Sequence, residues 1–517
     1  MSDPSAPPAA AVAAPRPAAL DDRALLGHPR GLGLLFVTEM WERFSYYGMR
    51  ALLVLYLVNQ LRWDTARATS LYGTYTMAVY LTPLVGGYLA DRWIGTRRSL
   101  VIGGVIIALG HFTLALPGLA AFYVGLALII AGTGFFKSNV STMVGQIYPT
   151  GDTRRDAGFT IFYMGVNLGA FLGPLVCGYL AQTERFGWHW GFAAAGVGMV
   201  LGLAVYLWGR EKYLPGIGVG GARRGAGHAA GEQRGGRTAL DGAIGAGAGA
   251  LVAALLGGGS ALGILAGLLV GAMVGVTVLG TRGDERRRVV ALFIVVFFVV
   301  FFWAAYEQAG SSLNLFADKN TDLVVLGWQI PSSWFQSVNA LAILIFALPF
   351  AGLWQSLAAR RREPSTALTM VLGLFLLGVG FLFMLAGGRR ADGGVLVSPA
   401  WLVLAYLFHT FGELCLSPVG LSYVTKLAPA RFASLLMGAW FLANAAANKI
   451  AGALAGLTPV PGQARPEAAE GIAGFLQRVS ATNAGFYSIF VVSSFAAAAL
   501  MLLFVPLLKR LTKGAAS

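Results

Sequence analysis

The residues with the clearest chemistry lie in the segment EMWERFSYYGMR (39–50), which places four charged side chains in an otherwise apolar stretch. Positions three and four apart share one face of a helix. A helix here would therefore carry two glutamates and two arginines on one stripe, where they can neutralise each other while facing a polar cavity. An alternative is a buried ion-pair network that only holds helices together. The stripe comprises Glu39, Glu42, Arg43, Tyr46, Tyr47 and Arg50.

Three more ionisable residues stand alone in apolar stretches, namely Lys137, Glu307 and Glu413. An ionisable group at mid-bilayer costs about 2.5–3.5 kcal/mol, so each is a candidate functional residue. A buried ammonium group needs an anionic partner, and we expect Lys137 to pair with Glu39 or Glu42. His409, one helical turn before Glu413, either pairs with that carboxylate or simply packs.

These charges divide unequally along the chain. The N-terminal half supplies three cations, Arg43, Arg50 and Lys137, whereas the C-terminal half supplies Glu307 and Glu413. Opposed positive and negative walls would complement a zwitterion, with its carboxylate near the cations and its ammonium group near Glu413. A sugar site would not need four carboxylates, and a drug exporter would not need three cations.

The composition indicates that these charges lie in a membrane. Of the 517 residues, 56% are hydrophobic and only 12% are charged, with a mean hydropathy of +0.68. Soluble domains carry roughly 25% charged residues. The net charge of +15 is spread in short clusters between apolar blocks, which argues against a nucleic-acid partner. No metal-ligand spacing or nucleophile–base pair is evident, so we expect no enzyme activity, no metal and no cofactor.

The apolar blocks follow a pattern of six, two and six, and we expect fourteen membrane-spanning helices. The expected regions are a disordered cytoplasmic tail, a six-helix bundle, a cytoplasmic linker with two extra helices, and a second six-helix bundle. Their ranges are 1–28, 29–209, 210–288 and 289–517. Blocks are expected at about 31–60, 68–90, 98–116, 120–147, 157–182, 190–209, 240–258, 260–280, 289–316, 328–357, 366–387, 398–427, 432–458 and 481–510.

The distribution of basic residues predicts the orientation. With the N-terminus inside, the cytoplasmic side holds 26 of the 38 Lys and Arg residues and the opposite side holds 8. Cytoplasmic loops carry the excess of positive charge. This split predicts that both termini are cytoplasmic.

The loop GGYLADRWIGTRRS (86–99) resembles the signature of the major facilitator superfamily, with its Gly, Asp-Arg, Gly and two basic residues. The 6+6 pattern fits the same architecture. Asp91, Arg92 and Arg97 are candidates for a cytoplasmic latch between the two halves. The alternative is ordinary positive charge on the inner side.

Several segments resemble a more specific family, the proton-dependent oligopeptide transporters, and those that carry Lys137, Glu307 and Glu413 are among them. EMWERFSYYG (39–48) is similar to that family's ExxER-F-x-YY signature, and FYMGVNLGAFLGP (162–174) is similar to its FYxxIN-x-G signature. The resemblance implies proton coupling by Glu39, Glu42, Arg43, Lys137 and Glu307, with Glu307 pairing with Arg43. It also supports the two extra helices, which bacterial members have. The peptide-binding positions that it implies are Tyr46, Tyr47, Arg50, Tyr80, Tyr163, Asn167, Asn339, Glu413, Ser417 and Trp440.

One departure is Ala340, where the family pattern usually has Pro after the Asn. The resemblance predicts proton-coupled symport of di- and tripeptides by alternating access, in a bacterial inner membrane. The expected partners are the peptide, protons and the lipid bilayer, without an obligate protein partner. Alternatives are transport of another small solute, such as nitrate or an amino-acid-like metabolite, and a peptide-binding membrane sensor that does not transport.

Overall fold

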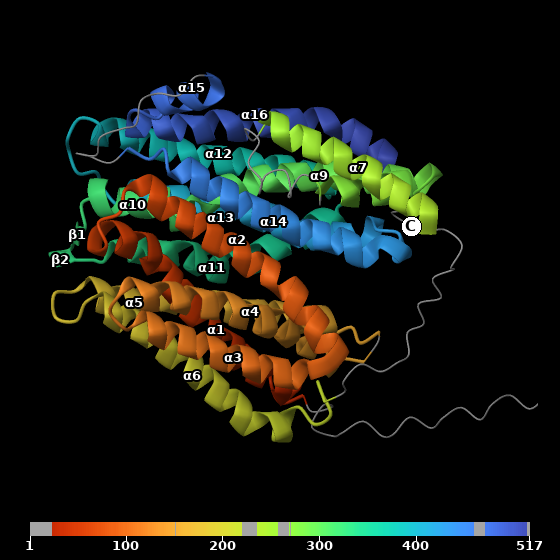
Figure 1. Cartoon of the computed structure of the whole chain (residues 1–517), viewed down its shortest axis with the longest axis horizontal. Coiled ribbons are helices and arrows are strands. Elements are labelled where there is room, and N and C mark those ends of the chain that lie inside the picture. Colours follow the sequence, from red (N-terminus) through yellow and green to blue (C-terminus); the bar gives the residue numbers. More distant parts are fainter. Residues whose placement is uncertain are drawn as a thin grey trace, which may run out of the picture.

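The computed structural model describes residues 23–149, 151–219, 235–256, 268, 270–459 and 471–513, and within these ranges the protein is almost entirely helical (Figure 1). Most of the predicted tail lies outside the described residues. Its last residues, 23–28, are ordered against the helix ends, because Leu25 and His28 bridge each other. His28 is 6% exposed, and its Nδ1 lies 2.8 Å from the Tyr148 hydroxyl. The expectation of a loose tail is therefore wrong for this last part.

The N-terminal half is a bundle of six helices whose limits follow the apolar blocks closely. Asp64 begins the second helix by accepting a hydrogen bond from the Arg67 amide, and Gly95, with φ of 83°, separates the second from the third. Short π-helical turns at Tyr56–Gln60 and Ala90–Ile94 extend the first two helices. The six helices are α1 (Arg30–Leu55), α2 (Thr65–Leu89), α3 (Thr96–Leu114), α4 (Leu119–Ile147), α5 (Arg155–Gln182) and α6 (Trp188–Tyr213).

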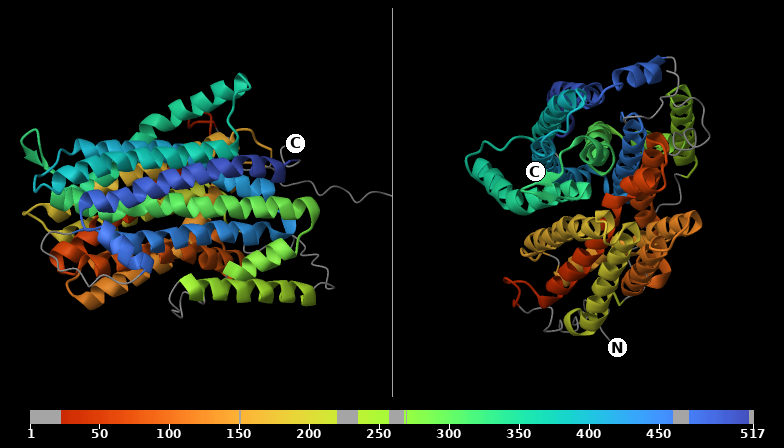
Figure 2. Two further views of the ribbon diagram at one scale, coloured as in Figure 1. Left: turned by 90° about the horizontal axis from the view of Figure 1, so that it is seen from above. Right: turned by 90° about the vertical axis from the view of Figure 1, so that its left-hand side faces the viewer.

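Between the halves, α7 (Gly235–Leu256) is the first of the two expected extra helices, and helical residues 270–279 belong to the second. The segment 257–267 lies outside the described residues. Gly245 meets Gly271 and Gly275 at backbone distance, so glycines permit this close helix contact. Figure 2 shows α7 at the margin of the main bundle.

The C-terminal half contains a second set of long helices, with three short elements that the sequence did not predict. These elements are the strands β1 (Val324–Val325) and β2 (Trp328–Gln329), which pair antiparallel, and the surface helix α15 (Gly471–Val479). The helices are α9 (Gly283–Tyr306), α10 (Ser312–Asn320), α11 (Gln336–Ala359), α12 (Thr366–Ala391), α13 (Ala400–Leu427), α14 (Ala433–Ala455) and α16 (Asn483–Leu511).

The expected span at 289–316 is not one continuous helix. It is divided where α9 ends at Tyr306, and a 3-10 turn, Glu307–Gly310, leads through Ser311 to α10. The Gln308 amide donates 3.0 Å to the Ala451 carbonyl oxygen of α14, which holds the turn in place. The break brings a charged residue to the end of a helix inside the protein.

Eight helical segments among the described residues are long and apolar enough to cross a membrane. α1 is not one of them, because its own charged residues lower its apolar character. Mean hydropathy therefore supports a membrane protein with many spans and leaves the count of fourteen unconfirmed. The eight are α3, α4, α5, α6, Gly283–Asn320, Ser332–Ala359, α12 and α16.

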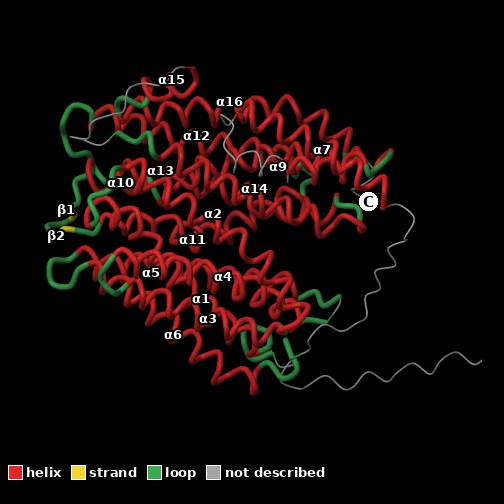
Figure 3. Tube along the Cα trace, in the orientation of Figure 1, coloured by secondary structure: helices red, strands yellow, loops and turns green. Residues whose placement is uncertain are grey.

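The two halves meet along two helix pairs, α2 with α14 and α5 with α11 (Figures 1 and 3). At the first crossing, a Cβ atom on Gly73 would lie 2.9 Å from Gly452 Cα, so the two backbones touch. At the second, Ser337 Oγ donates 2.7 Å to the Phe171 carbonyl oxygen.

The halves are also tied together at the end where β1 and β2 lie. The Asn59 side chain, just after α1, donates 2.9 Å to Asp318 and accepts a 2.7 Å hydrogen bond from Lys319. Gln182 at the end of α5 donates 2.8 Å to Ser332. The described C-terminal end lies at the opposite end of the bundle (Figure 1).

Candidate functional site

Three of the four charged residues of the α1 stripe, Glu39, Glu42 and Arg43, pair with one another, whereas Arg50 pairs with the other half. Arg43 Nε lies 2.7 Å from Glu39 Oε1 and 2.9 Å from Glu42 Oε2. All three side chains are buried. The second oxygen of Glu39 and one guanidinium nitrogen of Arg43 have no hydrogen-bond partner among the described residues. The cluster is therefore neutralised only in part and retains capacity for a ligand or a proton.

Lys137 on α4 lies beside this cluster but does not form the expected ion pair with Glu39 or Glu42. Its Nζ is 4.5 Å from the centre of the Tyr80 ring, a cation–π contact across α2 and α4. Arg43, on the same helix, already pairs with Glu39 four residues before it and with the adjacent Glu42. The predicted pairing is thus wrong for this conformation, although Lys137 and Tyr80 do lie together.

Glu307 makes an ion pair between the halves, and its partner is Arg50. A short ion pair joins the Arg50 guanidinium to the Glu307 carboxylate, and Arg50 Nε donates 2.6 Å to the Tyr72 hydroxyl. The resemblance had implied pairing with Arg43, two helical turns earlier. The break after Tyr306 explains the difference, because the 3-10 turn packs against Tyr72 and so lies level with Arg50.

Glu413 on α13 is held by two neutral donors from other helices. The Tyr306 hydroxyl donates a short hydrogen bond to Glu413 Oε2, and Asn339 Nδ2 donates 3.0 Å to the same atom. Asn339 Nδ2 also lies 2.9 Å from Thr410 Oγ1. Asn339 faces Glu413 although Ala340 replaces the proline of the family pattern. The sequence analysis did not name three residues that contact these candidates, namely Tyr306, Thr410 and Tyr72. For Tyr306, its position next to Glu307 in the sequence could have indicated its place in the site.

The other aromatic candidates surround these ion pairs. Tyr46 and Tyr47 contact each other edge to face at 5.1 Å, with Arg43 5.6 Å from the Tyr46 ring and Arg50 5.8 Å from the Tyr47 ring. The Tyr46 and Tyr75 hydroxyls are buried without a partner among the described residues. Unpaired hydroxyls beside charged groups suit a polar ligand, since burying such groups unpaired is costly.

The remaining candidates are Tyr163, Asn167, Trp440 and Ser417. Asn167 donates 2.9 Å to the Tyr163 carbonyl oxygen one turn earlier on α5. Trp440 is 9% exposed on α14. The side chain of Ser417 lies outside the described residues.

The predicted latch residues do not bridge the halves here. Arg97 lies 3.0 Å from Glu211 near the end of α6 and 2.8 Å from the Ile217 carbonyl oxygen just after that helix, and both partners fall within the expected linker, 210–288. Arg92 lies over the ring of its neighbour Trp93, and Asp91 is exposed. In this conformation Arg97 fastens the start of the linker to its own half.

His409 packs and does not pair with Glu413. Its ring centre lies 4.5 Å from that of Phe381 and 6.4 Å from that of Tyr306, and it is 2% exposed. Both hydrogen bonds to Glu413 come from other residues, so the simpler of the two interpretations holds for His409.

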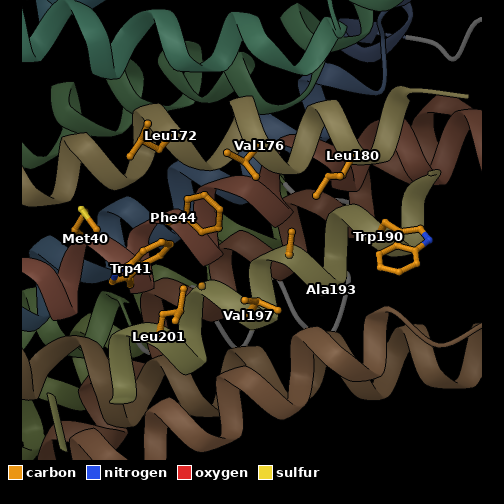
Figure 4. Close-up of a pocket in the computed structure, with 12 residues that line it drawn as sticks. Met40, Trp41, Phe44, Leu172, Val176, Leu180, Trp190, Ala193, Val197 and Leu201 are labelled. Carbon is orange, nitrogen blue, oxygen red and sulfur yellow. The ribbon is translucent and has the colours of Figure 1, made fainter. Parts of the chain in front are cut away.

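An apolar cavity of about 450 Å³ lies between α1, α5 and α6 and is separate from the charged site (Figure 4). Met40, Trp41 and Phe44 line it from α1, while Glu39, Glu42 and Arg43 on the same helix pair with one another. Every lining residue is apolar or glycine, so this cavity offers nothing to bind a charged substrate.

Taken together, a bundle of long apolar helices with buried charges between two halves defines a membrane transporter. Residues 97–215 and 265–470 match the sequence profile of the POT family, and the chain belongs to this family. Its members are transporters and not enzymes.

The relatives with similar sequences are also named as transporters. The chain is 36% identical over 455 residues to a peptide transporter of Yersinia enterocolitica, and this alignment covers 84% of this chain and 89% of the relative. It is 35% identical over 448 residues to a di-/tripeptide transporter of Lactococcus lactis, covering 83% and 89%. It is 40% identical over 443 residues to the uncharacterised transporter YclF of Bacillus subtilis, covering 84% and 89%.

Solved structures agree with the sequence relatives. The crystal structure of a peptide transporter POT in complex with sulfate matches with a TM-score of 0.78 and 38% identity, covering 96% of this chain and 98% of the other. A POT family transporter in complex with 5-aminolevulinic acid matches with a TM-score of 0.76 and 31% identity, covering 95% and 98%.

Proposed function

We propose that this protein imports di- and tripeptides by symport with protons, through alternating access of the two halves. The observation that carries the proposal is the ion pair between Arg50 of the N-terminal half and Glu307 of the C-terminal half. A carboxylate that competes with a substrate for the same cation links proton binding to substrate binding. The relatives named as peptide transporters support the substrate class.

In this proposal, the peptide carboxylate binds among Arg43, Arg50 and Lys137, and the ammonium group binds at Glu413. Neutral donors hold Glu413, so its negative charge remains for a cationic ligand. Nitrate has no ammonium group and would leave that charge unpaired, which favours a zwitterion over a simple anion. Around these charges, Tyr46, Tyr47, Tyr80, Tyr163, Asn167, Asn339, Ser417 and Trp440 are the proposed peptide contacts.

Proton coupling then works through competition for Arg50. Protonation of Glu307 removes the charge that binds Arg50, which frees the guanidinium group for the peptide carboxylate. Loss of the proton on the cytoplasmic side restores the ion pair and helps to expel the peptide. Glu39 and Glu42 act on Arg43 in the same way, two helical turns earlier on the same stripe of α1.

We further infer fourteen spans in the 6+2+6 order of the major facilitator fold, an inner-membrane location and cytoplasmic termini. The 26 to 8 split of basic residues supports this orientation. The end carrying β1 and β2, which Asn59 and Asp318 tie together, would then face outward and be closed. Asp91, Arg92 and Arg97 remain proposed as a latch that engages when the cytoplasmic end closes.

The test uses purified protein in liposomes with a pH gradient, acid outside. Labelled dialanine should accumulate against its concentration gradient, and collapse of the pH gradient with a protonophore should stop this accumulation. Nitrate should neither accumulate nor compete. Binding of dialanine without counterflow would favour a sensor, and nitrate accumulation without dialanine uptake would replace the proposed substrate class.

A further inference from the structure

Glu413 and Glu307, the two carboxylates of the C-terminal half, are joined through neighbouring residues of the chain. Tyr306 donates its hydroxyl hydrogen to Glu413, and the next residue, Glu307, pairs with Arg50 of the other half. α9 ends at Tyr306 and the 3-10 turn begins at Glu307. Any movement of the turn that accompanies breaking of the ion pair acts directly on the last residue of α9.

The Tyr306 ring has little freedom apart from the end of α9. It stacks on Phe302 with ring centres 5.6 Å apart and planes at 20°, and Trp303 meets it edge to face at 5.1 Å. Its hydroxyl position therefore follows the backbone at the end of α9, and that backbone adjoins the ion pair.

The hydrogen bonds to Glu413 from the described residues both end on Oε2, which leaves Oε1 for another donor. The two donors differ in what they connect. Asn339 comes from α11 and reaches the turn only indirectly, because its partner Thr410 donates to the Tyr406 carbonyl oxygen and the Tyr406 hydroxyl donates to Ala309. Tyr306 alone of these two donors connects Glu413 directly to the residue that pairs with Arg50.

We propose that Tyr306 is a positioning residue that transmits the state of the Arg50–Glu307 ion pair to Glu413. While the pair is formed, the hydroxyl fixes the carboxyl group with Oε1 free for a peptide ammonium group. The ammonium group therefore binds first, while the pair is formed. Protonation of Glu307 then breaks the pair, which frees Arg50 for the peptide carboxylate, and the end of α9 moves only after Glu413 has its ligand. This inference rests on the proposed function, since it assigns Glu413 to the amino terminus of a peptide.

The experiment measures discrimination, defined as the concentration of N-acetyl-dialanine needed for half-maximal competition divided by that of dialanine. Tyr306→Phe removes only the hydroxyl, and we expect discrimination to fall about tenfold, as for loss of one hydrogen bond to a charged group. Tyr406→Phe is the matched control, because the Tyr406 hydroxyl donates 3.1 Å to the Ala309 carbonyl oxygen of the same turn without contacting Glu413. It should keep discrimination within about twofold.

Transmission is tested by combining variants with Glu307→Gln. Tyr306→Phe should have little further effect on discrimination in that background, because the signal it carries is already lost. Asn339→Leu should lower discrimination by the same factor with or without Glu307→Gln, since independent sites act additively.

Several results would overturn the proposal. These are unchanged discrimination in folded Tyr306→Phe, an equal loss in Tyr406→Phe, additivity of Tyr306→Phe with Glu307→Gln, or failure of Tyr306→Phe to fold, which would make Tyr306 structural. If the wild-type protein does not distinguish dialanine from its N-acetyl form, the proposed function itself is refuted. If the wild type does distinguish them and Tyr306→Phe leaves this discrimination unchanged, only the present inference is refuted.

Discussion

Replacing Glu307 by Gln should separate proton-driven uptake from peptide exchange. Glu307 and Arg50 are 4% and 7% exposed, so the ion pair lies away from water. Removing one partner of a buried pair costs about 3–5 kcal/mol. Gln keeps an acceptor for Arg50, so we take the lower value of about 3 kcal/mol, which corresponds to roughly a hundredfold shift away from the state in which the halves are tied here.

The assay compares two fluxes of labelled dialanine in liposomes. Accumulation driven by a pH gradient should be lost in Glu307→Gln, because no proton can be released at this position. Exchange between equal internal and external peptide pools should remain measurable, since Arg50 and Glu413 are still present. Normal accumulation by this variant would refute the assignment of Glu307 to proton coupling.

Glu285→Gln is the control for the loss of an ion pair in general. Glu285 lies 2.5 Å from Arg431, and both side chains are partly exposed. Surface pairs contribute about 0–1 kcal/mol, so both fluxes should stay within about fivefold of wild type. Loss of exchange as well as accumulation in Glu307→Gln, together with a lowered unfolding temperature, would indicate a structural ion pair.

Four other changes test separate parts of the site. Lys137→Ala should insert normally but lose uptake, because it removes a cation beside the Glu39–Glu42–Arg43 cluster; wild-type uptake across the pH range would make Lys137 structural. Glu413→Gln should weaken competition by dialanine at least tenfold and by N-acetyl-dialanine less than twofold or so, since only the former carries an ammonium group; equal losses would contradict the assignment. His409→Ala should change uptake by less than about tenfold, as expected for a packed ring, and larger losses would restore it to the site. Burial, and then the charge of Arg154, lowers the pKa of His28 from its ordinary value of 6.5. The contribution of His28 to stability is therefore present above about pH 6.5 and is lost as the pH falls toward the folded-state pKa. In thermal unfolding, His28→Gln should lose less stability below that pH than wild type does, and an equal loss in the two proteins would show that folding does not change the pKa of His28.

The helix limits were largely predictable because apolar blocks end at charges, glycines and prolines. α4 was expected at 120–147 and spans Leu119–Ile147, and α12 was expected to begin at 366 and does. The break after Tyr306 was not predictable from local sequence. It depends on tertiary hydrogen bonds, such as that from the Gln308 side chain to the Ala451 carbonyl oxygen, which a pattern within one segment does not contain.

The candidate site was predictable in its residues more than in its pairings. Helical periodicity gives the face on which a side chain lies, and it correctly placed Glu39, Glu42 and Arg43 together. Helical periodicity does not give the position of one helix along the axis of its neighbour. Glu307 consequently met Arg50 rather than Arg43, because the irregular turn shifts it along the axis of α1.

The contact of α2 with α14 restricts which sequences this fold can accept. A Cβ atom on Gly452 would lie 2.6 Å from the Thr69 carbonyl oxygen, and one on Gly73 would lie 3.0 Å from that of Asn448. The obstacles are main-chain atoms, so no shortening of a neighbouring side chain can make room. A larger residue at either position would therefore have to push one backbone away from the other, so the chain must keep its smallest residue where the two halves meet.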